Sequence, residues 1–209
     1  GLIHSTFLLL VITVGVVGVL HTIVPDHWAP IAVIARQRGW SRRETARVAA
    51  GAGLGHALST IAIGILAFFA GAIAAQRLGH AINLAAGCAL IAFGLWSTIG
   101  AIRELTATVD AVPSASVLPT RTALMLILGS SPSIEVVPTF LAAAPLGIAA
   151  FLALSLVFSI TTIGTYVVTC VLSAAGLEQF RYAPVERYGE VISGMLVSII
   201  GVVFLIWFR

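Results

Sequence analysis

The sequence predicts an all-α, polytopic membrane protein with about six transmembrane helices, forming a single transmembrane domain over residues 1–209. Two observations predict this class. Hydrophobic residues make up 59% of the chain and charged residues only 9%, with a mean hydropathy of +1.10, whereas a soluble domain carries about 25% charged residues. The apolar residues also form runs that are long enough to cross a bilayer core, which needs about 20 residues per helix. We therefore expect the lipid bilayer to be a partner of this chain.

Six apolar runs follow one another along the chain. The expected spans are residues 5–35, 48–74, 80–102, 121–143, 145–173 and 188–208. The first run is too long for one straight crossing, so we expect it to bend or break near Pro25 and Pro30. The fourth run contains Pro132 and Pro138, and we expect a broken helix there as well.

The arginines indicate how the spans are oriented. Nine of the eleven lie in three connections, five in residues 36–47 and two each in 103–121 and 178–187, whereas the opposite side holds Arg77 and Arg209. The positive-inside rule then predicts a multi-pass protein of the cell (inner) membrane with a cytoplasmic 36–47 loop and both termini outside. Because the arginines have this topological explanation, the sequence pI of 9.4 does not indicate a nucleic-acid partner.

The third and fourth spans are joined by "TATVDAVPSASVL", residues 106–118, which is rich in small and polar residues and predicts a cytoplasmic linker. The linker separates halves 1–105 and 119–209. Each half has three spans, so the second half enters the membrane inverted relative to the first. The stretch "HWAPIAVIA" from His27 also resembles "EVVPTFLAA" from Glu135. Either a 3+3 inverted repeat with broken helices 1 and 4 explains this similarity, or it is a chance match between apolar segments.

The stretch "HTIVPDHWAP" places three ionisable residues, His21, Asp26 and His27, inside the first apolar run. On an unbroken helix His27 would lie about 120° around the axis from His21, so the side chains would not converge. Pro25 and Pro30 cannot donate hydrogen bonds to the carbonyls of His21 and Asp26, and we expect the helix to open between them. The three side chains could then turn toward one point, where imidazole nitrogens and a carboxylate are suitable ligands for a nickel, cobalt or zinc ion. The alternative is a kinked helix whose polar groups form hydrogen bonds with their neighbours.

Other polar residues in the spans are further candidates. His56, in "GLGHALSTI", follows glycines that allow close helix packing, and it is either a ligand or a hydrogen-bonding core residue. Glu135 either ligates the ion, relays a proton or forms a hydrogen bond within the bundle. Side chains that would line the same second-half cavity are Ser131, Ser133, Thr161 and Thr162. Two histidines near the outer ends of their spans would collect metal at an entrance, or are simply solvated: His4 and His80.

Two of these stretches resemble a known family. "HTIVPDH" resembles the HX4DH motif of the nickel/cobalt transporter family, and "LGHALST" is similar to the LGHS-type segment in that family's next span. Together they cover the first third of the chain, which looks closest to the shorter, six-span branch of HX4DH-type permeases. The resemblance implies that His21, Asp26, His27 and His56 recognise the metal. The resemblance also implies that the protein is a transporter and not an enzyme, with Ni²⁺ or Co²⁺ as its substrate and no prosthetic group. The family's later signature of clustered Asp, Thr and Glu is not matched literally.

Two other function classes remain as alternatives. His21 and Asp26 also match the HX4D spacing of some acyltransferases, in which histidine acts as a base and aspartate orients it. A carrier of electrons by thiol redox chemistry would use Cys88 and Cys170. The sequence has no Walker motif, so we expect a secondary transporter or a channel-like permease. The sequence leaves open the metal, the direction of transport, the energy coupling and the oligomeric state.

Overall fold

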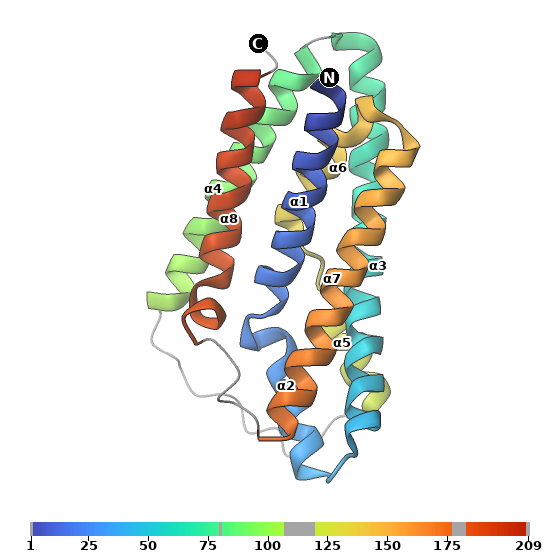
Figure 1. The fold of residues 1–209 in the computed structure, drawn as a ribbon, viewed down its shortest axis with the longest axis vertical. Coiled ribbons are helices and arrows are strands. Elements are labelled where there is room, and N and C mark those ends of the chain that lie inside the picture. The colour runs from blue at the N-terminus through green and yellow to red at the C-terminus, as the bar shows by residue number, and fades with distance from the viewer. Residues whose placement is uncertain (1, 80, 107–119, 177–182, 208–209) are drawn as a thin grey trace.

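A computed structural model describes the chain except for residues 1, 80, 107–119, 177–182 and 208–209. The described residues form helices and no strand, which confirms the all-α class. In chain order the elements are α1 (Leu2–Thr22), α2 (Pro25–Gln37), α3 (Arg42–Leu78), α4 (Ala81–Thr106), α5 (Arg121–Gly129), the 3₁₀ helix η1 (Ile134–Val136), α6 (Val137–Ala143), the 3₁₀ helix η2 (Ala144–Leu146), α7 (Ile148–Ala174) and α8 (Ala183–Trp207) (Figure 1).

Several of these helices are long and apolar enough to span a membrane. Among the described residues, α1, α3, α4, α7 and α8 meet this condition, and a sixth span exists if α5 and the segment Ile134–Leu146, which bend by 41° at their junction, count as one. These helices support a protein embedded in a membrane. Helix α3 has 37 residues and is about 55 Å long at 1.5 Å per residue. It begins before the apolar run because Ser41 and Glu44 form a capping box at its start.

The interruption in the first apolar run lies earlier than the sequence predicts. We expected the helix to open between Pro25 and Pro30, but α1 ends at Thr22, and α2 is helical from Pro25 through Pro30 to Gln37. Pro25 begins a helix readily because the first-turn N–H groups have no partner within the helix. The Nε1–H of Trp28 donates to the carbonyl of Ile23, 2.8 Å away, and so satisfies one backbone group at the interruption.

The fourth apolar run is interrupted between Gly129 and Ile134. A Cβ atom on Gly55 of α3 would lie 3.0 Å from the Cα of Gly129, so α3 and α5 contact each other backbone to backbone at the end of α5. The chain then turns through Pro132 into η1 and α6, of which α6 packs against both α3 and α4. The contact between Gly55 and Gly129 places the interruption after α5 directly beside the middle of α3.

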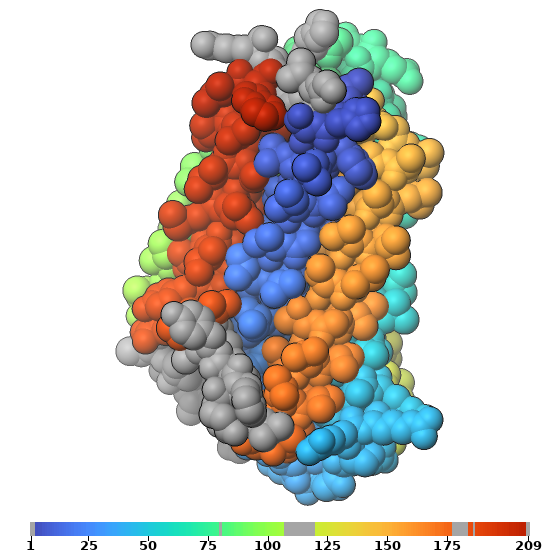
Figure 2. Space-filling view, in the orientation of Figure 1, coloured from blue at the N-terminus to red at the C-terminus, as the bar shows by residue number. Residues whose placement is uncertain are grey.

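The long helices pack in pairs, α3 against α7 and α4 against α8, and α1 packs against both α7 and α8 (Figures 1 and 2). Buried apolar side chains of α1 and α7, among them Leu10, Val14, Leu154 and Phe158, form the centre of the core. The start of α1 and the end of α8 lie at one end of the bundle, whereas the connection between α2 and α3 lies at the other (Figure 1).

Arginines at the second end have structural partners. Arg36 donates hydrogen bonds to the carbonyl of Ser173 in the last turn of α7. Arg121 forms an ion pair with Glu44 at 2.8 Å, and its guanidinium lies 5.0 Å from the centre of the Trp40 ring. The predicted linker 106–118 falls outside the described residues except for Thr106, which ends α4.

Candidate metal centre

Three histidines from different helices meet inside the bundle. His21 lies in the last turn of α1, His27 in the first turn of α2 and His56 in the middle of α3, and all three are buried. Their ring centroids are 4.4 Å apart for His21 and His27, 5.5 Å for His21 and His56, and 5.4 Å for His27 and His56. One ring nitrogen from each lies within 4.8 Å of the corresponding nitrogens of the other two. We call this group the histidine cluster.

Local backbone features bring the histidine cluster together. The interruption after Thr22 changes the direction of the chain between His21 and His27, which would point about 120° apart on one continuous helix. Gly53 and Gly55 bring α3 close to its neighbours. A Cβ atom on Gly53 would lie 3.0 Å from the Cα of Ile163. A larger residue at Gly53 would push α3 away from α7, and one at Gly55 would push it away from α5. Either change would displace His56, which follows the two glycines.

Asp26, the fourth predicted ligand, lies beside the histidine cluster. Its side chain is 63% exposed, and its Oδ1 is 2.7 Å from Nδ1 of His27. The carboxylate therefore contacts one ring nitrogen of His27, and the other ring nitrogen remains for a ligand.

Glu135 contacts the histidine cluster from the second half of the chain. It is buried on η1, and its Oε1 lies 2.5 Å from Nδ1 of His21. A second carboxylate oxygen, Oε1 of Glu190 on α8, lies 3.4 Å from the same nitrogen. A carboxylate stabilises a protonated Nδ1 of His21, and it forms an ion pair with the ring when both ring nitrogens carry a proton.

Ser133 contacts the third histidine. Its Oγ lies 2.9 Å from Nε2 of His56. The N–H of Ser133 donates to the hydroxyl of Thr60 at 2.9 Å, and this hydroxyl donates to the carbonyl of His56 at 2.9 Å. Within the described part of the chain, Nδ1 of His56 is buried and forms no hydrogen bond. A neutral His56 that donates through Nε2 has the lone pair of Nδ1 free for a ligand.

The other predicted residues have varied positions. Ser131 is exposed, and the hydroxyl of Thr161 donates to the carbonyl of Val157 in its own helix. Thr162 is fully buried, and its hydroxyl forms no hydrogen bond to any described residue. His4 is exposed in the first turn of α1, about 25 Å along the helix from His21. His80 lies outside the described residues.

Sequence reasoning missed two side chains of the site. Tyr166 of α7 is fully buried, and its ring centroid lies 6.2 Å from that of His27 and 6.1 Å from that of His56. Nothing distinguishes this tyrosine from the other aromatic residues in apolar helices. Glu190 did carry a signal, because an ionisable residue inside an apolar span is by default a candidate functional residue.

The arrangement is suited to binding a metal cation. Imidazoles converge on one point, and a carboxylate or hydroxyl lies behind each ring, which is how protein metal sites orient histidine ligands. No lysine exists in this chain, and carboxylates are the charged groups that contact the histidine cluster in the described residues. Comparison with protein-family models, curated proteins and solved structures found no match.

Proposed function

We propose that this protein transports a divalent transition-metal ion across a membrane, with Ni²⁺ or Co²⁺ as the substrate and the histidine cluster as its binding site. The observation that carries the proposal is the convergence of three buried ligand nitrogens within 4.8 Å of one another. Neutral imidazole suits nickel, cobalt and zinc, whereas magnesium and calcium prefer oxygen ligands.

The nitrogens that face carboxylate or hydroxyl groups indicate which nitrogens bind the ion. Nδ1 of His21 faces Glu135, Nδ1 of His27 faces Asp26, and Nε2 of His56 faces Ser133. In this proposal the remaining nitrogen of each ring is the ligand. Carboxylate and hydroxyl groups in this position hold the orientation of the ring and raise the basicity of the ligand nitrogen. Asp26 then acts through His27 and does not bind the ion itself.

The charges around the histidine cluster favour a divalent cation. A charge inside a membrane protein is unfavourable unless a charge of opposite sign is close. Three neutral imidazoles leave the two positive charges of the ion uncompensated, and the carboxylates of Glu135 and Asp26 supply two negative charges next to the rings. An anionic substrate would meet only repulsion from the same carboxylates.

Transport, as opposed to a structural metal site, is supported by the position of the cluster. The end of α1 and the segment η1 meet where His21 contacts Glu135, and interrupted helices that meet within the membrane are typical of transporter binding sites. Helix α3 packs on α7 and α4 on α8, so each long helix contacts its counterpart in the other half. This pairing supports the 3+3 inverted repeat. In this proposal segment 36–47, which joins α2 to α3, is cytoplasmic and both termini are outside the cell membrane.

The contacts favour metal transport over the two alternatives. In the acyltransferase interpretation Asp26 would orient His21, but Oδ1 of Asp26 contacts His27, and His21 faces Glu135. In the redox interpretation two thiols would have to react with each other. Cys170 is buried and donates to the carbonyl of Trp28 at 3.6 Å, whereas Cys88 is exposed on α4.

Metal flux into proteoliposomes tests the proposal. The purified protein is reconstituted, and initial uptake of Ni²⁺, Co²⁺, Zn²⁺, Mn²⁺ and Mg²⁺ is measured at neutral pH. We expect saturable flux of Ni²⁺ or Co²⁺ that His21→Ala abolishes and His4→Ala, in the same helix but distant from the cluster, leaves unchanged. Absence of flux for all five ions with a folded wild-type protein would overturn the proposal.

A further inference from the structure

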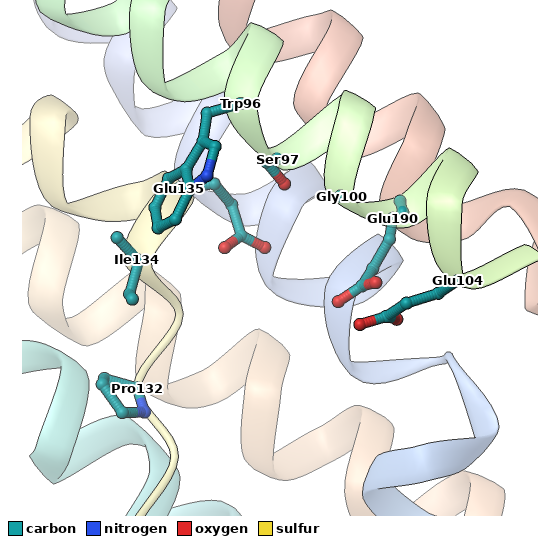
Figure 3. Close-up of a pocket in the computed structure, with 9 residues that line it drawn as sticks. Trp96, Ser97, Gly100, Glu104, Pro132, Ile134, Glu135 and Glu190 are labelled. Carbon is teal, nitrogen blue, oxygen red and sulfur yellow. The ribbon is translucent and has the colours of Figure 1, made fainter. Parts of the chain in front are cut away.

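An acidic cavity lies next to the histidine cluster. It has a volume of about 320 Å³ and lies between α4, the start of α8 and the interruption after α5. Three glutamates, Glu104, Glu135 and Glu190, contribute to its wall, and Figure 3 shows the carboxylates of Glu104 and Glu190 side by side with that of Glu135 across from them. No arginine or histidine belongs to the described lining.

The cavity and the histidine cluster share a wall. Glu135 and Glu190 line the cavity, and Oε1 of each also contacts Nδ1 of His21, at 2.5 and 3.4 Å. The glutamates become more buried towards this wall. Glu104, in the last turns of α4, is exposed, Glu190 is half-buried, and Glu135 is buried. The cavity thus extends from the exposed end of α4 to the two carboxylates that contact the imidazole of His21.

The charges of this cavity attract cations. Glu190 lies within electrostatic range of Glu104, Glu135 and Asp26, so several carboxylates repel one another. Glu135 is 6% exposed and points into the cavity (Figure 3). The described lining holds no cationic side chain, so a cation that enters the cavity meets charges of opposite sign.

The cavity is large enough for a hydrated ion. At about 30 Å³ per water molecule, 320 Å³ holds roughly ten waters. An octahedral divalent ion carries about six. The ion can therefore approach His21 before it loses its water, and carboxylate oxygens bind such a hydrated cation less selectively than imidazole nitrogens bind nickel or cobalt.

We propose that this cavity is the access route of the divalent cation to the histidine cluster, with Glu104 attracting the hydrated ion and Glu190 and Glu135 leading it to His21. The inference rests on the proposed function, because it presumes that the cluster binds a metal. It adds a second, weaker cation site made of carboxylates and assigns a role to Glu104 and Glu190.

The rate at which Co²⁺ reaches the histidine cluster tests the route. The full chain is placed in nanodiscs and mixed rapidly with Co²⁺, whose visible absorption reports nitrogen coordination. We expect Glu104→Gln and Glu190→Gln to slow the association several-fold at low salt. Glu104 does not contact the histidine cluster, so Glu104→Gln should leave the final Co²⁺ spectrum unchanged. High salt should reduce the difference, because salt screens the attraction of exposed carboxylates for the ion.

Glu44→Gln is the matched control. Glu44 lies at the end of the bundle that holds the α2–α3 connection, and its side chain is 37% exposed. It does not line the cavity, and glutamine preserves its capping box. This variant removes the same charge and should associate at the wild-type rate. If all three variants are equally fast while the wild type develops the Co²⁺ spectrum, the route is wrong and the proposed function stands. If the folded wild type develops no such spectrum, the proposed function itself fails.

Thiol accessibility tests whether water reaches the cavity. Ser97 lines it, and Ser97→Cys in a Cys88→Ser background leaves Cys170 as the other thiol, which is buried. A charged methanethiosulfonate reagent should modify the thiol introduced at position 97. Co²⁺ association should then be slower than in the unmodified variant. A lipid-facing cavity would leave this thiol unmodified, and that result would overturn the route.

Discussion

The two interruptions of the apolar runs supply different chemistry to one site. The interruption between α1 and α2 carries two imidazoles, His21 and His27, and the one between α5 and α6 carries a carboxylate and a hydroxyl, Glu135 and Ser133. After the first interruption α2 begins directly with Pro25, whereas at the second interruption Ser130–Ser133 lie outside any helix.

This difference indicates a division of roles between the halves. The first half provides the nitrogens that would bind the ion, and the second half contacts the opposite sides of two of the rings. The exception is His27, whose carboxylate partner Asp26 comes from its own helix and is largely exposed. We therefore expect loss of a histidine at the first interruption to remove binding and loss of the carboxylate at the second to weaken it.

The largest expected effect comes from removing a ligand. His21→Ala, His27→Ala and His56→Ala should each reduce Ni²⁺ affinity by more than the roughly 100-fold that loss of an outer partner costs at most. The measurement is isothermal titration calorimetry with protein in detergent, and circular dichroism checks the fold. His4→Ala is the matched control because it removes an exposed imidazole from the same helix. Wild-type affinity in all three cluster variants would contradict the site.

The second-largest effect is expected from low pH, which should weaken metal binding. An imidazole binds metal only when neutral, and an unperturbed histidine titrates near pH 6.5. Affinity should therefore fall as pH decreases, because protons compete with the metal for the ring nitrogens. Initial metal flux against pH, without a pH gradient, reports this, and its midpoint should move to lower pH as metal concentration rises. A flat profile from pH 7.5 to 5 at low metal would contradict histidine ligation.

Replacing the buried carboxylate of the second interruption should have an intermediate effect. Glu135→Gln keeps the shape of the side chain but removes the negative charge next to His21, and we expect Ni²⁺ affinity to fall about 10–100-fold. The Co²⁺ spectrum of the bound state should remain that of nitrogen coordination, because all three imidazoles are still present. Complete loss of the spectrum would instead identify Glu135 as a ligand.

The smallest effect is expected for the exposed carboxylate of the first interruption. Asp26→Asn should reduce Ni²⁺ affinity by no more than about tenfold, the lower limit for an outer partner, because water screens a 63% exposed side chain. Calorimetry of Asp26→Asn and Glu135→Gln under the same conditions gives the comparison directly. A larger loss for Asp26→Asn would reverse the assignment and would favour direct ligation by Asp26, as the sequence motif alone suggests.

Much of this fold follows from local patterns. Apolar runs predict the membrane helices, and the prolines predict interruptions in the first and fourth runs, although the first interruption precedes Pro25. Ser41 and Glu44 carry the capping-box pattern that begins α3. The HX4DH motif places two of the three clustered histidines, and the glycines before His56 anticipate its close packing. Glu104, Glu190 and Tyr166 were missed, because single polar residues do not reveal which helices they face.

The sequence by itself determined the membrane class, the approximate positions of the spans and the candidate histidines, because hydropathy and proline act over a few neighbouring residues. Only the tertiary structure decided which side chains meet. The contact of Gly55 with Gly129 sets the position of α3 beside the second interruption, and the packing of α2 on α7 turns His27 towards His56. Asp26 lies outside the cluster and Glu135 reaches His21 for the same physical reason: the direction of a side chain beyond a helix break depends on contacts with distant parts of the chain.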